Sequence, residues 1–279
     1  MKFSPLAKAI ALTGMSSILA AAPSLASAAF IEDSKASLEL RNFYMNQDTR
    51  HSGDVNKDAG NKTKEEWGQG FIFRYESGFT EGTVGVGLDV YGAVAVKLAG
   101  GHNRSPDMFP QDKSTGHSKD NFGKLGGTAK FKLSKTELRV GALMPRLPAI
   151  QANLEGRLLP QIFSGGLLTS KEITGLTVNL MHLDKVNPRS ASNYVHMTLD
   201  TRGGYNKGIV TKSGNSAAGV EGGSFDMAHL NYKFSDSLTA GYSFSRLEDL
   251  YKQHLVNAVH TLDLGEQRSL RTDVRVARS

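Results

Sequence analysis

The stretch Thr83–Leu98, TVGVGLDVYGAVAVKL, decides the fold of this chain. Its even-numbered positions are apolar apart from Gly92, and its odd-numbered positions are small or polar, as at Asp89 and Lys97. Such period-two alternation is typical of a β-strand that has one apolar and one polar face. At about 3.3 Å per residue the strand would be roughly 50 Å long, which is enough to cross a bilayer at a tilt of about 45°. The stretch therefore predicts a membrane-spanning β-strand.

The N-terminus has the features of an export signal. Two lysines precede the apolar run 9–22, and Ala26-Ser27-Ala28 provides the small residues of a cleavage site. We therefore predict that residues 1–28 are a cleaved signal peptide and that residues 29–279 are exported. The chain contains no cysteine, so the exported part must be held together by packing and hydrogen bonds rather than by disulfides.

Alternating segments recur along the rest of the chain and predict about eleven strands. Short turns, such as those at Gly78, Ser134 and Ser235, mostly alternate with long loops. Outer-membrane barrels have this asymmetry, with tight turns on the periplasmic side and long loops outside. We therefore predict an all-β, transmembrane antiparallel β-barrel with strands at 37–47, 67–76, 83–98, 122–134, 137–143, 164–172, 176–182, 224–234, 238–246, 250–262 and 270–278.

The number of predicted strands is odd, whereas single-chain bacterial barrels close with an even number. An open sheet edge in lipid leaves unpaired backbone groups, each of which costs several kcal/mol. The chain also stops at Ser279, within an alternating segment. We therefore expect an incomplete barrel, the N-terminal portion of a longer one.

Several motifs follow one another along the exported part: FIEDS (30–34), LRNFYMNQD (40–48), WGQGFIFRYESGFTEGTVGVGLDVYG (67–92), GGTAKFKLSKTELRVGALMP (126–145), GRLLPQ (156–161) and LEDLYKQH (247–254). They resemble the OprD-type substrate-specific porins of Gram-negative outer membranes. The resemblance implies an eighteen-stranded barrel with a narrow eyelet in the cell outer membrane. It also implies diffusion of small water-soluble substrates that carry a carboxylate, such as basic amino acids or aromatic acids.

The polar faces of the predicted strands carry more basic than acidic residues. Rows of lysine and arginine attract anions, and the planar guanidinium can bind both oxygens of a carboxylate. We predict a lumen selective for carboxylates; the alternative for any single residue is a charge that only pairs with an acidic neighbour. The predicted pore-lining basic residues are Arg41, Arg74, Lys97, Lys124, Lys130, Lys132, Arg139, Lys233, Arg271 and Arg275.

The segment 145–163 differs from the other loops because it combines three prolines with several leucines. Proline limits backbone freedom, and so many leucines are unusual in a loop that lies in water. We predict a constriction loop that folds into the barrel, with its apolar part against the inner wall and its charged part at the eyelet. The alternative is a surface loop or a contact between protomers. The predicted constriction residues are Arg146, Pro148, Asn153, Glu155 and Arg157.

The expected surroundings of the barrel are outer-membrane lipid and lipopolysaccharide, and the expected oligomeric state is a monomer or a weak trimer. The formal net charge is +6, but the basic residues are spread along strand faces, so nucleic acid is not an expected partner. Candidates for aromatic girdles at the two membrane interfaces are Trp67, Phe71, Tyr75, Tyr91, Tyr232, Phe234 and Tyr242.

An enzyme is the contrasting class of function, and a lipase-like outer-membrane barrel needs a Ser–His pair. The sequence has no G-x-S-x-G and no H-E-x-x-H motif. An EF-hand-like spacing that begins at Asp54 has Ala59 in place of the required glycine. We therefore predict no enzyme activity, no cofactor and no metal, while a Ser/His pair brought together by folding remains open. A secreted β-sandwich binding protein is a further alternative.

Overall fold

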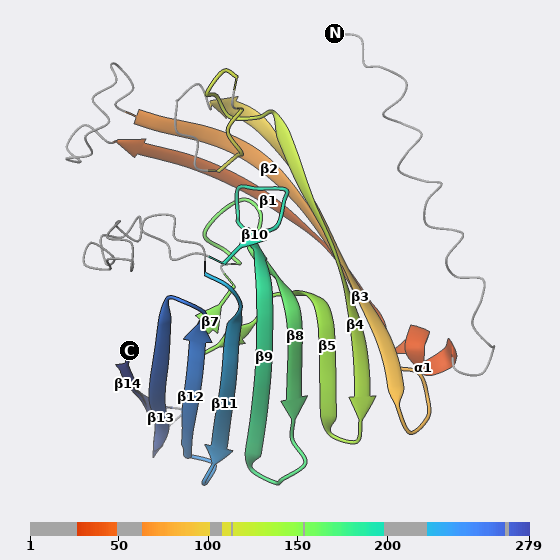
Figure 1. Cartoon of the computed structure of the whole chain (residues 1–279), viewed down its shortest axis with the longest axis vertical. Coiled ribbons are helices and arrows are strands. Elements are labelled where there is room, and N and C mark those ends of the chain that lie inside the picture. The colour runs from red at the N-terminus through yellow and green to blue at the C-terminus, as the bar shows by residue number, and fades with distance from the viewer. Residues whose placement is uncertain are drawn as a thin grey trace.

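The computed structural model describes residues 27–48, 63–100, 108–112, 114–152, 154–197, 222–265 and 268–279. Within these residues, one antiparallel sheet contains twelve strands. Eleven of them follow one another in the order β1-β2-β3-β4-β5-β8-β9-β11-β12-β13-β14, and the short β10 pairs with β9 beside this path (Figure 1). Each predicted strand corresponds to one strand of this path, so the prediction of an all-β antiparallel fold is confirmed.

The strands of the path are β1 (Lys35–Asp48), β2 (Thr63–Glu76), β3 (Gly85–Gly100), β4 (Asn121–Leu133), β5 (Thr136–Leu143), β8 (Ile162–Ser170), β9 (Leu176–Asn187), β11 (Phe225–Lys233), β12 (Leu238–Leu247), β13 (Tyr251–Gly265) and β14 (Arg268–Arg278). The remaining elements are short: α1 (Ser27–Glu32), β6 (Arg146–Leu147), β7 (Ile150–Gln151) and β10 (Val195–His196).

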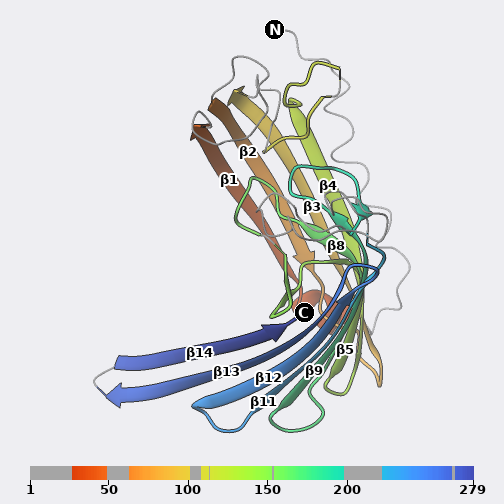
Figure 2. The same ribbon diagram turned by 60° about the vertical axis from the view of Figure 1, so that its left-hand side comes forward.

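The sheet is curved but unclosed, because β1 and β14 are the two ends of the path and do not pair with each other in the described residues. Figure 2 shows one strongly bent wall, with β1–β4 on one side of the bend and β11–β14 on the other. The unclosed sheet is consistent with the expected incomplete barrel. The short turns that follow β2, β4, β8 and β11 all lie at the lower end of the wall in Figure 1.

Several strands are longer than the alternating pattern predicts. β2 starts at Thr63 rather than at 67, where Thr63 pairs with Asp48 of β1. β9 extends to Asn187 and pairs with β10, so strand structure continues into the long connection between the predicted strands 176–182 and 224–234. The reason is that backbone hydrogen bonds continue the ladder beyond the last outward apolar residue, and period-two hydrophobicity does not detect polar rungs.

The predicted signal peptide lies mostly outside the described residues. Its last residues belong to α1, which extends across the predicted cleavage position before Ala29. The helix is docked on the sheet, since the Phe30 carbonyl accepts a hydrogen bond from Gly78 N at 3.0 Å; it also accepts one from Ser34 Oγ at 2.5 Å. No helix in the described ranges is long and apolar enough to cross a membrane.

The two faces of the sheet differ in the way that the β3 alternation predicts. Val86 and Val94 are 43% and 50% exposed on the outer face, whereas Tyr91 and Ala95 are 5% and 0% exposed on the inner face. The core of the protein is therefore the concave side, where loops cover the wall. Tyr91 is on this buried side, so its assignment to an outer aromatic girdle is wrong; Trp67, Phe71, Tyr232, Phe234 and Tyr242 are exposed.

Candidate pore wall and inner loop

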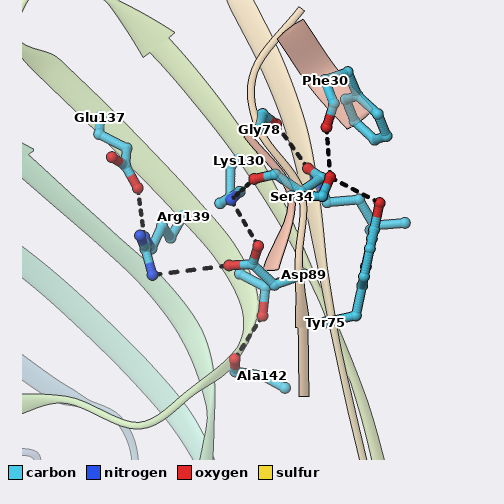
Figure 3. Close-up of polar contacts among 12 residues, drawn as sticks. Phe30, Ser34, Tyr75, Gly78, Asp89, Lys130, Glu137, Arg139 and Ala142 are labelled. Carbon is cyan, nitrogen blue, oxygen red and sulfur yellow. Dashed lines mark hydrogen bonds and ion pairs between the residues drawn. The ribbon is translucent and has the colours of Figure 1, made fainter. Parts of the chain in front are cut away.

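Two basic residues predicted to line the pore meet at one carboxylate on the inner wall (Figure 3). The Lys130 ammonium lies 2.6 Å from Asp89 Oδ1 and donates a hydrogen bond to the Ser77 carbonyl at 2.7 Å. The Arg139 guanidinium lies 3.8 Å from Asp89 Oδ2 and also pairs with Glu137. Strand pairing explains the cluster, because β4 lies between β3 and β5 and aligns Lys130 with Arg139. The Lys130 side chain is 5% exposed but that of Arg139 is 41% exposed, so only the guanidinium is presented to the open inner side.

A second cluster joins two other predicted residues through Glu39. Arg41 Nε donates to Glu39 Oε1 at 2.9 Å, and Arg74 Nη1 donates to Glu39 Oε2 at 2.9 Å. Arg74 also lies over the Tyr91 ring, with its guanidinium carbon 6.0 Å from the ring centroid. The Arg74 side chain is 28% exposed and that of Arg41 is 15% exposed. Of these two cations, which lie on the paired strands β1 and β2, Arg74 is therefore the more accessible one on the inner side.

Arg41 connects the wall to the predicted constriction loop. Its Nη1 donates to two loop carbonyls, that of Leu154 at 2.7 Å and that of Arg157 at 2.9 Å. The loop also packs by its leucines: Leu158 and Leu159 are fully buried in a cluster with Ile72, Ala95 and other inner-face residues. Gly70 permits this close approach, because a Cβ there would lie 3.2 Å from the Leu158 carbonyl oxygen.

Lys124 forms a further attachment of the same loop. It is 5% exposed, and its ammonium donates to the Pro160 carbonyl at 2.9 Å and to the Pro188 carbonyl. Pro160 belongs to the loop and Pro188 follows β9, so one side chain holds two connections on the wall. Lys124 therefore lies on the predicted face, but it does not present its charge to the open inner side.

The remaining predicted basic residues are separate from these clusters. Lys97 pairs with Asp120 at 2.8 Å, and Lys132 lies over the Phe79 ring with its ammonium 5.4 Å from the centroid. Lys233 pairs with Asp236 in a short turn, and Arg275 pairs with Asp273 at 2.9 Å on β14, the strand that also carries Arg271.

The predicted constriction residues lie in or beside a small hairpin of β6 and β7. Arg146 and Glu155 are exposed, and Pro148 and Arg157 are half-buried; Asn153 lies outside the described residues. The hairpin is closed by the Ala152 amide, which donates to the Pro145 carbonyl at 2.8 Å. Within the segment, Leu158 and Leu159 are thus buried against the wall, whereas Arg146 and Glu155 are exposed.

Glu66 is a structural residue that the sequence pattern did not reveal. Its carboxylate is buried and accepts hydrogen bonds from Met108 N at 2.7 Å and from Ser118 Oγ at 2.5 Å. These bonds place Met108 and Phe109 in the inner core, at 0% and 1% exposure. The connection between the predicted strands 83–98 and 122–134 therefore contributes an apolar pair, Met108-Phe109, to the inner core. This pair was the signal in the sequence that could have revealed the contact.

Folding does bring one Ser/His pair together. His229 Nδ1 lies 2.8 Å from Ser243 Oγ on the inner face, and both residues are buried. Among the described residues no carboxylate forms a hydrogen bond or ion pair with the His229 side chain, so the base of a catalytic triad lacks its orienting acid. The described residues also contain no group of three or more His, Cys, Asp or Glu side chains that could hold a metal ion. The EF-hand-like segment lies almost entirely outside the described residues.

Comparisons with known proteins agree with this architecture. The family model described as "outer membrane porin, OprD family" matches residues 28–279. The porin-like protein GalP of Pseudomonas putida is 35% identical over 85% of this chain and 52% of its own length. The crystal structure of OpdQ from Pseudomonas aeruginosa has a TM-score of 0.74 and 44% identity, and the match covers 90% of this chain and 58% of that one.

A third relative was crystallised with a small molecule. The structure of Pseudomonas aeruginosa OpdK with vanillate has a TM-score of 0.73 and 31% identity, over 89% of this chain and 58% of that one. The chain spans about half the length of the curated relatives that it matches.

Proposed function

Because the chain belongs to the OprD family of outer membrane porins, we propose that it forms part of the wall of an outer-membrane pore for small carboxylate-bearing solutes. The relatives are channels rather than enzymes, which leaves the lipase-like and β-sandwich alternatives without support. The observation that carries the proposal is the accessible inner-face pair Arg74 and Arg139, at 28% and 41% exposure. Each guanidinium is paired with a carboxylate and yet remains partly exposed.

Paired cations suit a channel better than free ones do. A pore must attract a solute strongly enough to admit it and weakly enough to release it. Glu39 and Asp89 neutralise part of the positive charge at these sites, which lowers the affinity for a passing carboxylate. The planar fork of arginine still offers two parallel hydrogen bonds to it. Vanillate, the small molecule in the OpdK structure, is itself an aromatic carboxylate, and we extend that substrate class to this chain.

We further infer that the segment Pro145–Phe163 narrows the pore. Leu158 and Leu159 fix it to the inner wall, and Arg41 and Lys124 bind its carbonyls. A loop held at so many points can keep a constant aperture. Its exposed charges, Arg146 and Glu155, are placed to act on solutes that pass.

The cellular context of the proposal follows from the sequence. Residues 1–28 act as a cleaved export signal, and the exported protein lies in the outer membrane of a Gram-negative bacterium, surrounded by its lipid and lipopolysaccharide. It works as a monomer or a weak trimer. Basic amino acids and aromatic acids are the two substrate groups to compare.

The test is deletion of residues 149–156 in the full-length protein, followed by single-channel recording in a planar bilayer. We expect a larger conductance in these recordings and, in liposome swelling, a smaller preference for benzoate over an uncharged solute of the same size. As a control, exchange of Ser237 for Thr in a turn at the opposite end should change neither quantity. An unchanged conductance would refute the constriction assignment. Equal swelling rates of liposomes in benzoate and in the uncharged solute, for the parent protein, would refute the carboxylate preference.

A further inference from the structure

The outer face of the wall carries a shallow apolar groove that no described element covers. Its volume is about 440 Å³, and it crosses the strands from β5 to β12. Two small residues, Gly166 and Ala228, make the depression, because their cross-strand neighbours on the outer face, such as His182, Leu180 and Phe244, carry large side chains. Strand pairing aligns the apolar row as Leu138, Leu168, Leu180, Ala228 and Phe244.

The next row toward the long loops is polar. Strand pairing aligns it as Gly166, His182, Asp226, Arg246 and Lys252. These side chains point to the same outer face as the groove, and His182 and Asp226 line its end. The apolar band of the outer face therefore stops at a row in which cations predominate.

Three side chains of this polar row, called the charged row below, are held in place by ion pairs and hydrogen bonds with one another and with a neighbour. His182 Nδ1 lies 2.7 Å from Asp226 Oδ1, and Arg246 Nη2 lies 3.5 Å from Asp226 Oδ2 and 3.8 Å from Glu248 Oε1. Their side chains remain accessible, at 60% for His182 and 41% for Arg246. Lys252 forms no ion pair or hydrogen bond with its side chain in the part of the chain that the structure describes, and it is exposed. Arg246 and Lys252 are direct cross-strand partners, so two cations lie side by side in the row that borders the His182 and Asp226 end of the groove.

We propose that this groove and the charged row bind a phosphorylated glycolipid of the outer leaflet. The long loops of an outer-membrane barrel face outside, which places the row at the level of outer-leaflet headgroups. An acyl chain matches the apolar groove, and a lipid phosphate matches the adjacent Arg246 and Lys252, since clusters of basic side chains at a membrane boundary attract anionic headgroups. Arg246 shares its charge with Asp226 and Glu248, whereas Lys252 is exposed and forms no ion pair in the described residues, so the phosphate lies toward Lys252.

The proposal is tested on the full-length protein in detergent by native mass spectrometry with diphosphoryl lipid A as the probe. R246Q/K252Q removes the two adjacent positive charges, and A228L fills the groove while it leaves the charges in place. K135Q/K171Q is the matched control, because it removes two exposed lysines from the short turns at the opposite end of the wall. Heat-modifiable migration in gels verifies that each variant is folded. If R246Q/K252Q does not fold, the proposal is tested by the lipid A affinities of K252Q and A228L.

We expect Kd for lipid A to rise about tenfold in R246Q/K252Q and about fourfold in A228L, and to stay within about twofold of the parent in K135Q/K171Q. Inorganic phosphate should fail to displace lipid A, because it lacks the chain that occupies the groove. Parent-like affinity of both R246Q/K252Q and A228L would overturn the proposal. So would an equal loss in K135Q/K171Q, full displacement by inorganic phosphate, or equal binding of phosphatidylethanolamine.

Discussion

The substitution Lys124→Met tests how the inner loop is held on the wall. Methionine keeps the length of the buried side chain but leaves the Pro160 and Pro188 carbonyls without their ammonium donor. A buried acceptor that loses its partner costs about 1–3 kcal/mol. Two such groups would favour detachment of the loop by about 2–6 kcal/mol, and release of the buried ammonium offsets part of this. We take about 2–3 kcal/mol as the net change.

The reporter is a cysteine at position 95 beneath the loop. The parent chain contains no cysteine, and Ala95 is fully buried in the cluster that holds Leu158 and Leu159, so Ala95→Cys reacts with a water-soluble maleimide only when the cover opens. A change of about 2–3 kcal/mol in the opening equilibrium predicts labelling that is about 30- to 150-fold faster in Lys124→Met.

The control is Lys132→Met, because Lys132 lies on the same strand but is exposed. Its labelling rate should stay within about twofold of the parent. Parent-like labelling in Lys124→Met, or equal acceleration in Lys132→Met, would refute the role of Lys124 as the attachment of the loop.

Three other predictions concern the wall and its turns. Arg139→Gln removes the more accessible cation of the Asp89 cluster, so the reversal potential in a salt gradient should shift toward cation preference; no shift would show that Arg139 does not face the pathway. Gly70→Val should lower the free energy of unfolding in urea by about 1–3 kcal/mol, because the new Cβ would lie 3.2 Å from the Leu158 carbonyl oxygen, whereas Gly127→Val, with nothing within 4 Å of its Cβ, should not. Hydrogen bonds from Thr136 and Ser134, and one from the Lys135 amide, hold the pKa of the Glu172 carboxyl below its ordinary value of 4.5. Its contribution to stability is therefore complete above pH 4.5 and is lost as the pH falls through the lowered pKa. The difference in thermal stability between the parent and Glu172→Gln should exist at pH 7 and vanish in acid; a difference that is constant with pH would contradict it.

The strands of the sheet could be predicted from the sequence because lipid requires an apolar residue at every second position of each strand. Val86 and Val94 face outward and Ala95 inward since a residue in a strand that meets hydrocarbon must be apolar, and its neighbours in sequence point to the other face. The rule weakens where the strand leaves the bilayer, which is why the polar start of β2 at Thr63 was not predicted.

The roles of the inward basic residues could not be predicted in the same way. Period-two alternation places Lys124, Lys130 and Arg139 on one face, but it cannot indicate what folds over that face. Lys124 and Lys130 are buried because loops and the Ser77 turn bring carbonyl oxygens to their ammonium groups. Arg139 has no such cover and stays 41% exposed. Nothing local to these residues in the sequence separates the two groups, because the covering segments come from distant positions.

This division has a physical basis that applies to the whole inner wall. Loop backbone on the concave side brings carbonyl groups that water cannot reach, and each of these groups needs a donor. Lysine and arginine have several donors on long side chains and carry no acceptor, so they can satisfy these carbonyls from a strand some distance away, as Arg41 does for Leu154 and Arg157. We therefore propose two roles for basic residues on the inner wall, attachment of loops and attraction of anions. Loss of an attachment residue should enlarge the pore, whereas loss of an exposed one should change its charge selectivity at constant size. Lys124→Met and Arg139→Gln separate these two effects on one strand pair.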